Sequence, residues 1–341
     1  DAFRAEVQSS AYQSVKYYET DPTLDALWAN LNTSGAVARF AAMWSKERKL
    51  AEALMVNFLR QKPSRSAELV RLLDESTKRD NGIDENTRLT LWRLNAKAGH
   101  KEAQMAQMDA ASSSSFSRKA RMNALAHLDF ENPEPLVVER ALQLRRSTLN
   151  TTDRSERELG SMALLSLGGL GDASHANQAM NDSIAQKLVG YLGITKTPAD
   201  TVTALQAIGN TGNSAALDAI KPYLNSQDES IRVNALEALR RMDSPQATGI
   251  AIASFEQNTD MVTRTAALRS LSSMPATPET MNWGRNVLSS AMADETRSQL
   301  AAWLGSQART YPENAALLRE LLRNTTSFEV KKSILKYIPP S

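Results

Sequence analysis

The sequence predicts an all-α protein built from stacked helix pairs, an α-solenoid. Two observations point to this fold class: short apolar motifs recur every 31 to 41 residues, and no stretch shows the period-two alternation of a β-strand. A third is the low content of turn-forming residues, 14 Gly and 12 Pro among 341 residues, which disfavours an all-β chain. At this length the alternatives are two domains or one elongated array, and the recurring motif favours the array.

The recurring motif is an apolar hexad that begins with alanine in its best copies. It reads ALLSLG, ALQAIG, ALEALR and ALRSLS, and weaker copies read ALAHLD and LAAWLG. In chain order the six copies begin at Ala124, Ala163, Ala204, Ala235, Ala267 and Leu300. Successive starts are therefore 39, 41, 31, 32 and 33 residues apart. This spacing fits one helix pair per repeat, as in HEAT-like repeats.

The spacing also predicts how the array is organised. We expect a HEAT-like α-solenoid, an α-α superhelix of about ten helix pairs in two layers, which forms a single domain over 1–341. Residues 1–154 are expected to be the less regular helical half, and residues 155–338 to hold the regular repeats.

The helix that contains the hexad ALEALR shows how one repeat is encoded. Its apolar residues recur at three- and four-residue intervals and form one stripe: Ile231, Ala235, Leu236, Leu239 and Met242. Its polar residues lie on the other face: Asn234, Glu237, Arg240 and Arg241. We expect Asp228 or Ser230 to cap the amino end, and the sequence Asp-Ser-Pro at 243–245 to end the helix.

The partner helix of this repeat is expected in SAALDAIKPYL, which begins at Ser214. Pro222 is expected to bend or shorten it, because proline lacks the backbone N–H that a helix interior requires. The preceding stretch GNTGN, 209–213, contains residues that tolerate positive φ and predicts a turn. A helix, a turn and a second helix thus follow within about thirty residues.

The first half of the chain is helical by pattern but less regular. Helix-period apolar residues predict helices at 24–31, 37–44, 50–60, 66–76 and 87–99. The serine-rich stretch at 111–117 and the stretch at 148–155 are predicted to be exposed loops or joints. The five tryptophans, Trp28, Trp44, Trp92, Trp283 and Trp303, lie within apolar helical patterns, which favours core packing.

The chain shows no pattern that indicates catalysis, a cofactor or a metal site. Cysteine is absent, which excludes disulfides, thiolate ligands and a cysteine nucleophile. His100, His127 and His175 are scattered singly, and a packed or surface role is favoured for His127. The glycine cluster LGGLG at 167–171 matches no nucleotide-binding pattern, and we interpret it as a turn. We therefore expect a non-enzyme without a cofactor.

The charge pattern disfavours binding to a polyanion. Forty basic residues against 38 acidic ones leave a net charge of +2. Basic groupings occur at 46–49, 118–121, 145–146 and 240–241. Aligned on one face they would contact a nucleic-acid backbone, whereas solvated helix faces explain them equally simply. Nucleic-acid binding is therefore the lesser alternative.

Residues 155–242 resemble the helical domain of the large lipid transfer proteins, the family of vitellogenin and microsomal triglyceride transfer protein. In that family an ALL-x-LG-x-L helix is followed by an AL-x-A-x-GN-x-G turn and a V/I-R-x-x-A-x-x-AL-R helix. This sequence matches these motifs at 163–170, 204–212 and 231–240, whereas 17–32 is similar only in helical character. The resemblance implies a two-layered right-handed superhelix around a lipid-filled cavity that β-domains supply. No β-rich segment occurs here, so the chain alone is not expected to enclose a lipid pool.

We expect a non-catalytic scaffold that binds a protein partner or a flanking β-rich domain through its curved surface. A lipid-binding module of the vitellogenin type is the alternative. The candidate partner contacts are Arg240, Arg241 and Arg264, on the polar faces of the regular repeats. The twelve methionines suit either an adaptable apolar groove or an ordinary core.

Two expectations concern where the protein is found. No run reaches the eighteen or so apolar residues of a membrane-spanning helix. The lack of cysteine suits an oxidising compartment, so an exported location, secreted or periplasmic, is favoured over the cytoplasm. The chain begins at Asp1 without a basic-plus-apolar leader, and we expect a processed protein or an excised domain.

Overall fold

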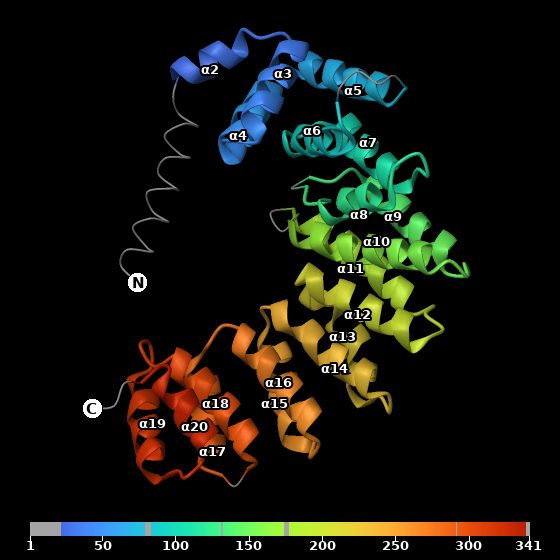
Figure 1. Cartoon of the computed structure of the whole chain (residues 1–341). Helices are drawn as coiled ribbons and strands as arrows, with labels where there is room; N and C mark the ends of the chain where they lie inside the picture. Colours follow the sequence, from blue (N-terminus) through green and yellow to red (C-terminus); the bar gives the residue numbers. More distant parts are fainter. Residues whose placement is uncertain (1–21, 79–82, 131, 174–176, 291, 339–341) are drawn as a thin grey trace. The chain divides into compact units, whose positions relative to one another are not determined.

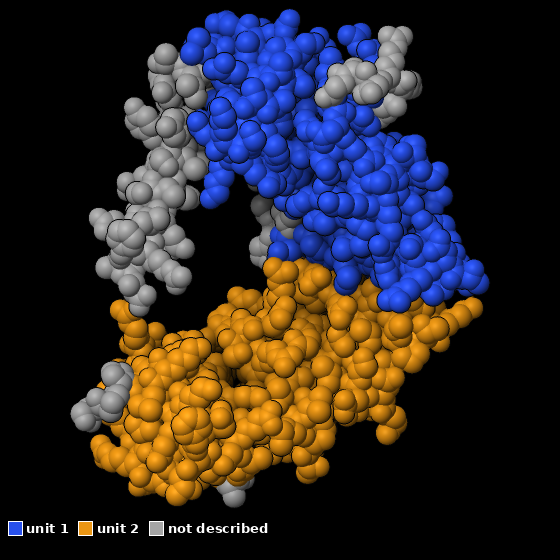
Figure 2. All heavy atoms as spheres, viewed as in Figure 1, with its two compact units in different colours: residues 1–181 blue, residues 182–341 orange. Residues whose placement is uncertain are grey.

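A computed structural model describes residues 22–78, 83–130, 132–173, 177–290 and 292–338, with side chains from residue 26 onward. Throughout these ranges the chain is helical and no residue forms a β-strand. The chain divides into two compact units, unit 1 at Asp1–Asn181 and unit 2 at Asp182–Ser341 (Figure 2). The all-α prediction is therefore confirmed. That the units form one domain stays a prediction.

Unit 1 consists of two layers of helices (Figure 1). One layer contains α2 (Pro22–Ala29), α4 (Arg48–Gln61), α6 (Glu85–Lys97), α8 (Arg118–Ala126) and α10 (Arg154–Ala173). The other contains α3 (Thr33–Trp44), α5 (Pro63–Lys78), α7 (Lys101–Ser112) and α9 (Pro135–Thr148). Within each layer every helix packs against the next one listed, and helices of the two layers pack on each other in pairs. Helix α11 (Gln178–Leu192) runs across the boundary at residue 181.

Unit 2 repeats the two-layer plan. Its first layer contains α12 (Pro198–Thr211), α14 (Glu229–Ala238), α16 (Met261–Ser273), α18 (Asp294–Ser306) and α20 (Phe328–Leu335). Its second layer contains α13 (Leu217–Ile220), α15 (Pro245–Gln257), α17 (Pro278–Leu288) and α19 (Pro312–Asn324). Three 3₁₀ segments, η1 (Ser214–Ala216), η2 (Lys221–Asn225) and η3 (Leu239–Arg241), lie beside α13 and α14.

All six hexads lie on the even-numbered helices α8, α10, α12, α14, α16 and α18, which we call the hexad layer of each unit. The first alanine of each alanine copy is nearly or fully buried, with an exposed fraction of 0% to 2%. Alanine at this point lets the neighbouring helix come close, and the following leucine fills the space beside it. The hexad is therefore a packing motif between successive helices of one layer.

The predicted register of α14 is correct. Ala235, Leu236 and Leu239 are fully buried and Met242 is nearly so, whereas Ile231 is only half-buried. The Asp228 carboxylate accepts hydrogen bonds from the backbone N–H groups of Ser230 and Ile231, which caps the helix as expected. Pro245 is the first residue of α15, where its fixed φ suits a helix start.

The turn predicted at 209–213 is shorter than expected, because α12 continues to Thr211. Gly212 alone has the positive φ, 65°, that ends the helix. Gly209 lies inside α12, and a Cβ there would come within 2.6 Å of the Cα of Ala238 on α14. This glycine therefore serves the close approach of two neighbouring helices.

Two other local predictions need correction. LGGLG at 167–171 is not a turn, because α10 runs through it to Ala173. Gly169 faces open space and does not interrupt the helix. The partner helix expected from Ser214 is broken into η1, α13 and η2, with Pro222 at the start of η2. The shortening expected from Pro222 is thus confirmed and extends to nearly the whole segment.

The predicted helices and loops of the first half are confirmed. The helices α2 to α6 lie at the five predicted segments, with α2 and α6 each ending two residues early, and the serine-rich loop begins only after α7 ends at Ser112. Trp28, Trp92 and Trp303 are core residues as expected, whereas Trp44 and Trp283 are half-buried. The turn between α9 and α10 lies at the second predicted loop.

Candidate partner-binding surface

The outward side chains of the hexad layer of unit 2 form a polar row that joins successive repeats. The Gln206 amide on α12 donates to the side-chain oxygen of Asn234 on α14 at 2.9 Å. Glu237 on α14 then forms an ion pair with Arg269 on α16 at 2.6 Å. These partners are 28 and 32 residues apart. The stacking of repeats therefore brings outward side chains of successive helices into contact.

Arg240 and Arg241 lie in η3, directly after α14, the middle helix of this row. Both are exposed, and Arg240 lies 3.7 Å from the carboxylate of Glu237. The Arg241 guanidinium donates to the carbonyl oxygen of Asn210 on α12 at 3.3 Å. Cations at this end of a helix are favoured by the helix dipole. The structure thus places two of the three predicted contacts together on one accessible edge.

Arg264 occupies a different environment. Its guanidinium lies over the ring of Phe255, 4.4 Å from the centroid, and donates to the Phe255 carbonyl at 3.2 Å. Phe255 is buried in the core of unit 2, so Arg264 helps to fix α15 against α16. Its side chain is half-buried instead of lying on an open face as the sequence pattern indicated.

A groove of about 340 Å³ follows the polar row between α16 and α18. It is lined by Thr265, Leu268, Arg269, Ser272, Gln299, Ala302, Trp303, Ser306 and Tyr337. Trp303 is 5% exposed, and its indole N–H has no hydrogen-bond partner in the described part of the chain. Tryptophan, tyrosine and arginine are enriched among the residues that contribute most to binding at protein interfaces.

Sequence reasoning missed this groove for a physical reason. Trp303 and Leu268 occupy apolar positions of hexads, where the pattern indicates core and carries no sign of an adjacent opening. Tyr337 comes from beyond α20 and reaches the groove only through the stacking of α18 on α20. A ring at the rim of a core cannot be told from a buried ring by periodicity alone.

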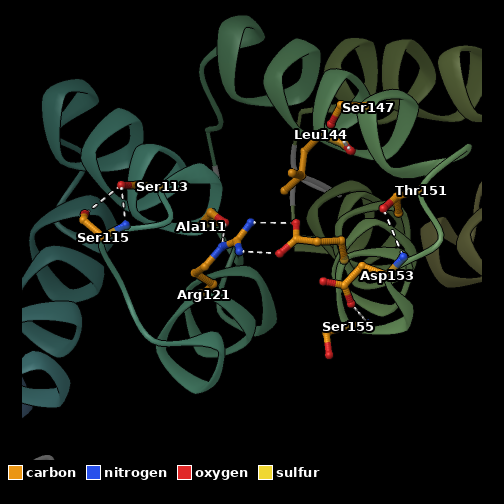
Figure 3. Close-up of polar contacts among 10 residues, drawn as sticks. Ala111, Ser113, Ser115, Arg121, Leu144, Ser147, Thr151, Asp153 and Ser155 are labelled. Atoms are coloured by element: carbon orange, nitrogen blue, oxygen red, sulfur yellow. Dashed lines mark hydrogen bonds and ion pairs between the residues drawn. The ribbon is translucent and has the colours of Figure 1, made fainter.

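Some arginines of the basic groupings of unit 1 form contacts within the fold. Arg121, 9% exposed, forms two hydrogen bonds with the Glu156 carboxylate, at 2.6 and 3.1 Å, and donates to the Ala111 carbonyl (Figure 3). Arg118 forms an ion pair with Glu158, and Arg48 lies over the ring of Trp44. These arginines therefore supply helix-to-helix contacts, which is a structural use of their charge.

The described histidines have structural surroundings. The His100 ring lies 3.0 Å from the Leu59 carbonyl. Burial lowers the pKa of His127, and the neighbouring Arg93 lowers it further. His175 lies outside the described residues. Within the described ranges, no three histidine, cysteine or carboxylate residues gather as a metal site would require. None of the described helices combines the length and apolar character needed to cross a membrane.

The comparison with protein families agrees with the repeat plan. The family described as HEAT repeats matches residues 195–272, which include α12 to most of α16. The crystal structure of Kap121p bound to Ste12p is similar to this chain, with 13% identity and a TM-score of 0.46. That match covers 95% of this chain and 39% of the other, so this chain spans about two fifths of the other's length. The crystal structure of an engineered protein is 20% identical, with a TM-score of 0.25, and the match covers 80% of this chain and 94% of that one.

No curated protein matches this chain. The match to HEAT repeats and the stacked helix pairs nonetheless identify the same architecture from independent evidence. The chain is an all-α, HEAT-like solenoid, as its hexads predict.

Proposed function

We propose that this chain is a non-catalytic scaffold that binds a partner protein or a neighbouring domain through the hexad layer of unit 2. The observation that carries this proposal is the polar row beside the groove of Trp303 and Tyr337. Arginine, tryptophan and tyrosine dominate the energy of protein interfaces, and all three occur on this surface. The partner surface we propose lies mostly within or next to the part of the chain that matches HEAT repeats.

The exposed arginines provide the test. We expect the double variant Arg240→Ala, Arg241→Ala to keep its fold, because both side chains are exposed, and to weaken partner binding about tenfold. The matched control is Arg60→Ala with Arg323→Ala, which removes two exposed arginines from the last turns of α4 and α19. Affinity capture from the native source, quantified by mass spectrometry, would compare the three proteins.

The proposal is supported if one protein is captured equally by the wild type and the control but in smaller amount by the Arg240, Arg241 variant. Equal capture by all three would contradict the role of the two arginines. A groove variant, Trp303→Ala, is a poorer probe because Trp303 is largely buried and its loss would disturb the core.

Lipid binding of the vitellogenin type is the second candidate, and the motif resemblance favours it. The matching segments lie on α10, on α12 with its Gly212 cap, and on α14 with η3. Organic extraction of the native protein, followed by mass spectrometry, separates the candidates. Stoichiometric lipid would favour the second candidate, and its absence would favour the scaffold. Nucleic-acid binding, the lesser alternative, requires an affinity that falls as salt rises. The exported location stays a prediction.

A further inference from the structure

Unit 1 has a groove of its own, separate from the surface on which the proposed function rests. It measures about 600 Å³ and is formed mainly by α5 and α7, with contributions from α6, the turn before α8, and the start of α9. Sites that hold compact ligands measure about 300–1,000 Å³. The groove therefore has room for several side chains of a bound segment.

The inner part of this groove is apolar. Trp92 is 2% exposed and lies against Phe116, with ring centroids 5.8 Å apart. Met105 is half-buried beside them, and Leu136 at the start of α9 is 53% exposed. The Trp92 indole N–H has no acceptor among the described residues. A buried donor without an acceptor is unfavourable, and it lies beneath the apolar side chains of the groove.

The groove is lined by an excess of negative charge. Four carboxylates line it, those of Asp74, Glu102, Asp109 and Glu134, against the single ammonium group of Lys101. The excess remains when Arg140 is added, which forms an ion pair with Asp109 from α9. Arg88, whose guanidinium lies 5.9 Å from the centroid of the Phe116 ring, is a third cation beside the groove, and the four carboxylates outnumber these three cations.

The carboxylates remain accessible to an incoming cation. The side chain of Asp109 is 58% exposed despite its ion pair with Arg140. Lys101 lies 2.8 Å from Glu134, but its side chain is 71% exposed, and ion pairs so exposed to water are weak. Glu102 is exposed and forms no ion pair within the described ranges, although the neighbouring Lys101 attracts it electrostatically. A cation from another molecule would therefore meet little competition at Glu102.

We propose that this groove binds a cationic segment of a partner protein that also carries apolar side chains. Lysine or arginine side chains of the segment contact Glu102 and Asp109, while its apolar side chains pack on Met105 and Leu136. Anionic ligands such as phosphates or fatty acids would meet like charges at the same positions. The choice of occupant rests on this charge complementarity together with the apolar floor.

A pair of synthetic peptides tests the proposal on the full chain. The first is a fluorescein-labelled nonapeptide of alternating lysine and leucine, and the second has glutamate in place of lysine. We expect fluorescence anisotropy to detect binding of the lysine peptide that weakens severalfold as ionic strength rises, because salt screens exposed charges. The glutamate peptide should bind much more weakly. Equal binding of both peptides, or binding of neither, would overturn the proposal.

Two matched pairs of variants locate the site. Glu102→Lys reverses an exposed charge in the first turn of α7 and should weaken binding of the lysine peptide roughly tenfold. Glu295→Lys makes the same change in the first turn of α18 in unit 2, and should leave binding unchanged. Leu136→Ser should weaken binding severalfold, whereas Ile194→Ser, at a similarly exposed position, should not.

Circular dichroism melts should show that each of these four exposed substitutions leaves the fold intact. If Glu102→Lys and Glu295→Lys weakened binding of the lysine peptide equally, the peptide would bind elsewhere and the proposal for this groove would be wrong. The Arg240, Arg241 variant should bind the lysine peptide as the wild type does. Failure of the scaffold surface on unit 2 is therefore distinguishable from failure of this groove.

Discussion

Units 1 and 2 share the stacked helix pair but fill its interior with different chemistry. In unit 1, long polar side chains are buried: the Gln107 amide donates to the carbonyls of Ala124 and His127, both at 2.9 Å, and Arg121 spans from α8 to Glu156 on α10. Buried polar residues of unit 2 are shorter, such as Thr263, Ser270 and Asn314. Long buried side chains fill variable gaps between helices, whereas short ones require a constant helix spacing.

The two units also differ in how regularly their sequences repeat. The hexads that begin in unit 2 lie 31 to 33 residues apart, and the earlier intervals are 39 and 41. Where alanine and glycine set the distance between helices, each repeat needs the same small residues at the same register. Where a glutamine or an arginine fills the gap, the residues that separate the helices differ from one helix pair to the next.

The largest expected effect is in the hexad core of unit 2. Leu236→Ala should lower the free energy of unfolding by about 2–5 kcal/mol, because Leu236 is fully buried and its truncation leaves a cavity. Urea denaturation followed by circular dichroism measures this change. Leu27→Ala, at a position 63% exposed in unit 1, is the control and should change stability by less than about 0.5 kcal/mol. A loss below about 1 kcal/mol for Leu236→Ala would contradict the repeat register.

The buried arginine of unit 1 comes next. Arg121→Met should cost about 2–3 kcal/mol, because it leaves the Ala111 carbonyl and the Glu156 carboxylate without their donor. Arg118→Met breaks the ion pair with Glu158, whose members are both exposed, and should cost less than about 1 kcal/mol. Denaturant titrations measure both changes. Equal losses in the free energy of unfolding would show that burial does not make Arg121 more important for stability than Arg118.

Two glycines sharpen the comparison because their substitutions should act in opposite directions. Gly209→Ala should destabilise by about 1–3 kcal/mol, since its Cβ would meet the backbone of Ala238. Gly169→Ala should stabilise by about 0.5–1 kcal/mol, because Gly169 lies in the interior of α10 with open space around it. Thermal melts measure both. Destabilisation by Gly169→Ala would contradict a helical LGGLG and favour the turn that the sequence predicts.

The smallest effect concerns pH and is confined to unit 1. The pKa of His127 is lowered from its usual 6.5 in the folded state, chiefly by burial and then by the charge of Arg93. Between the lowered and the usual value the unfolded chain binds more protons, so stability should fall as pH decreases below about 7. In His127→Gln this part of the pH dependence should disappear, as measured by urea midpoints between about pH 5 and 7. If the pH dependence of stability were unchanged in the variant, groups other than His127 would be its cause.

Much of the fold could be predicted because its signals are local. Helix-period stripes gave the positions of α3 to α6 and the register of α14, and Asp228 was identified as a cap from its place before an apolar run. The sequence did not reveal that LGGLG is helical. Glycine usually indicates a turn, but inside α10 the surrounding residues stabilise the helix despite it.

The candidate sites were only partly predictable. Arg240 and Arg241 were identified from the polar face of one helix, and they are exposed. Arg264 has the same sequence signature, yet the ring of Phe255 covers its guanidinium. Whether a surface arginine stays open depends on the neighbouring helix, which periodicity along one helix does not specify.

The sequence by itself determined that this chain is all-α, that its helices pair, and that the pairs repeat, because propensity, capping and apolar periodicity act over a few residues. Only the tertiary structure decided where the interior becomes polar and where grooves open. The groove of Trp92 and Glu102 gathers residues from four helices and a turn, and that of Trp303 depends on Tyr337 beyond α20. A groove is the space between elements, and its shape follows from the packing distances between helices, which the periodicity of a single helix does not contain.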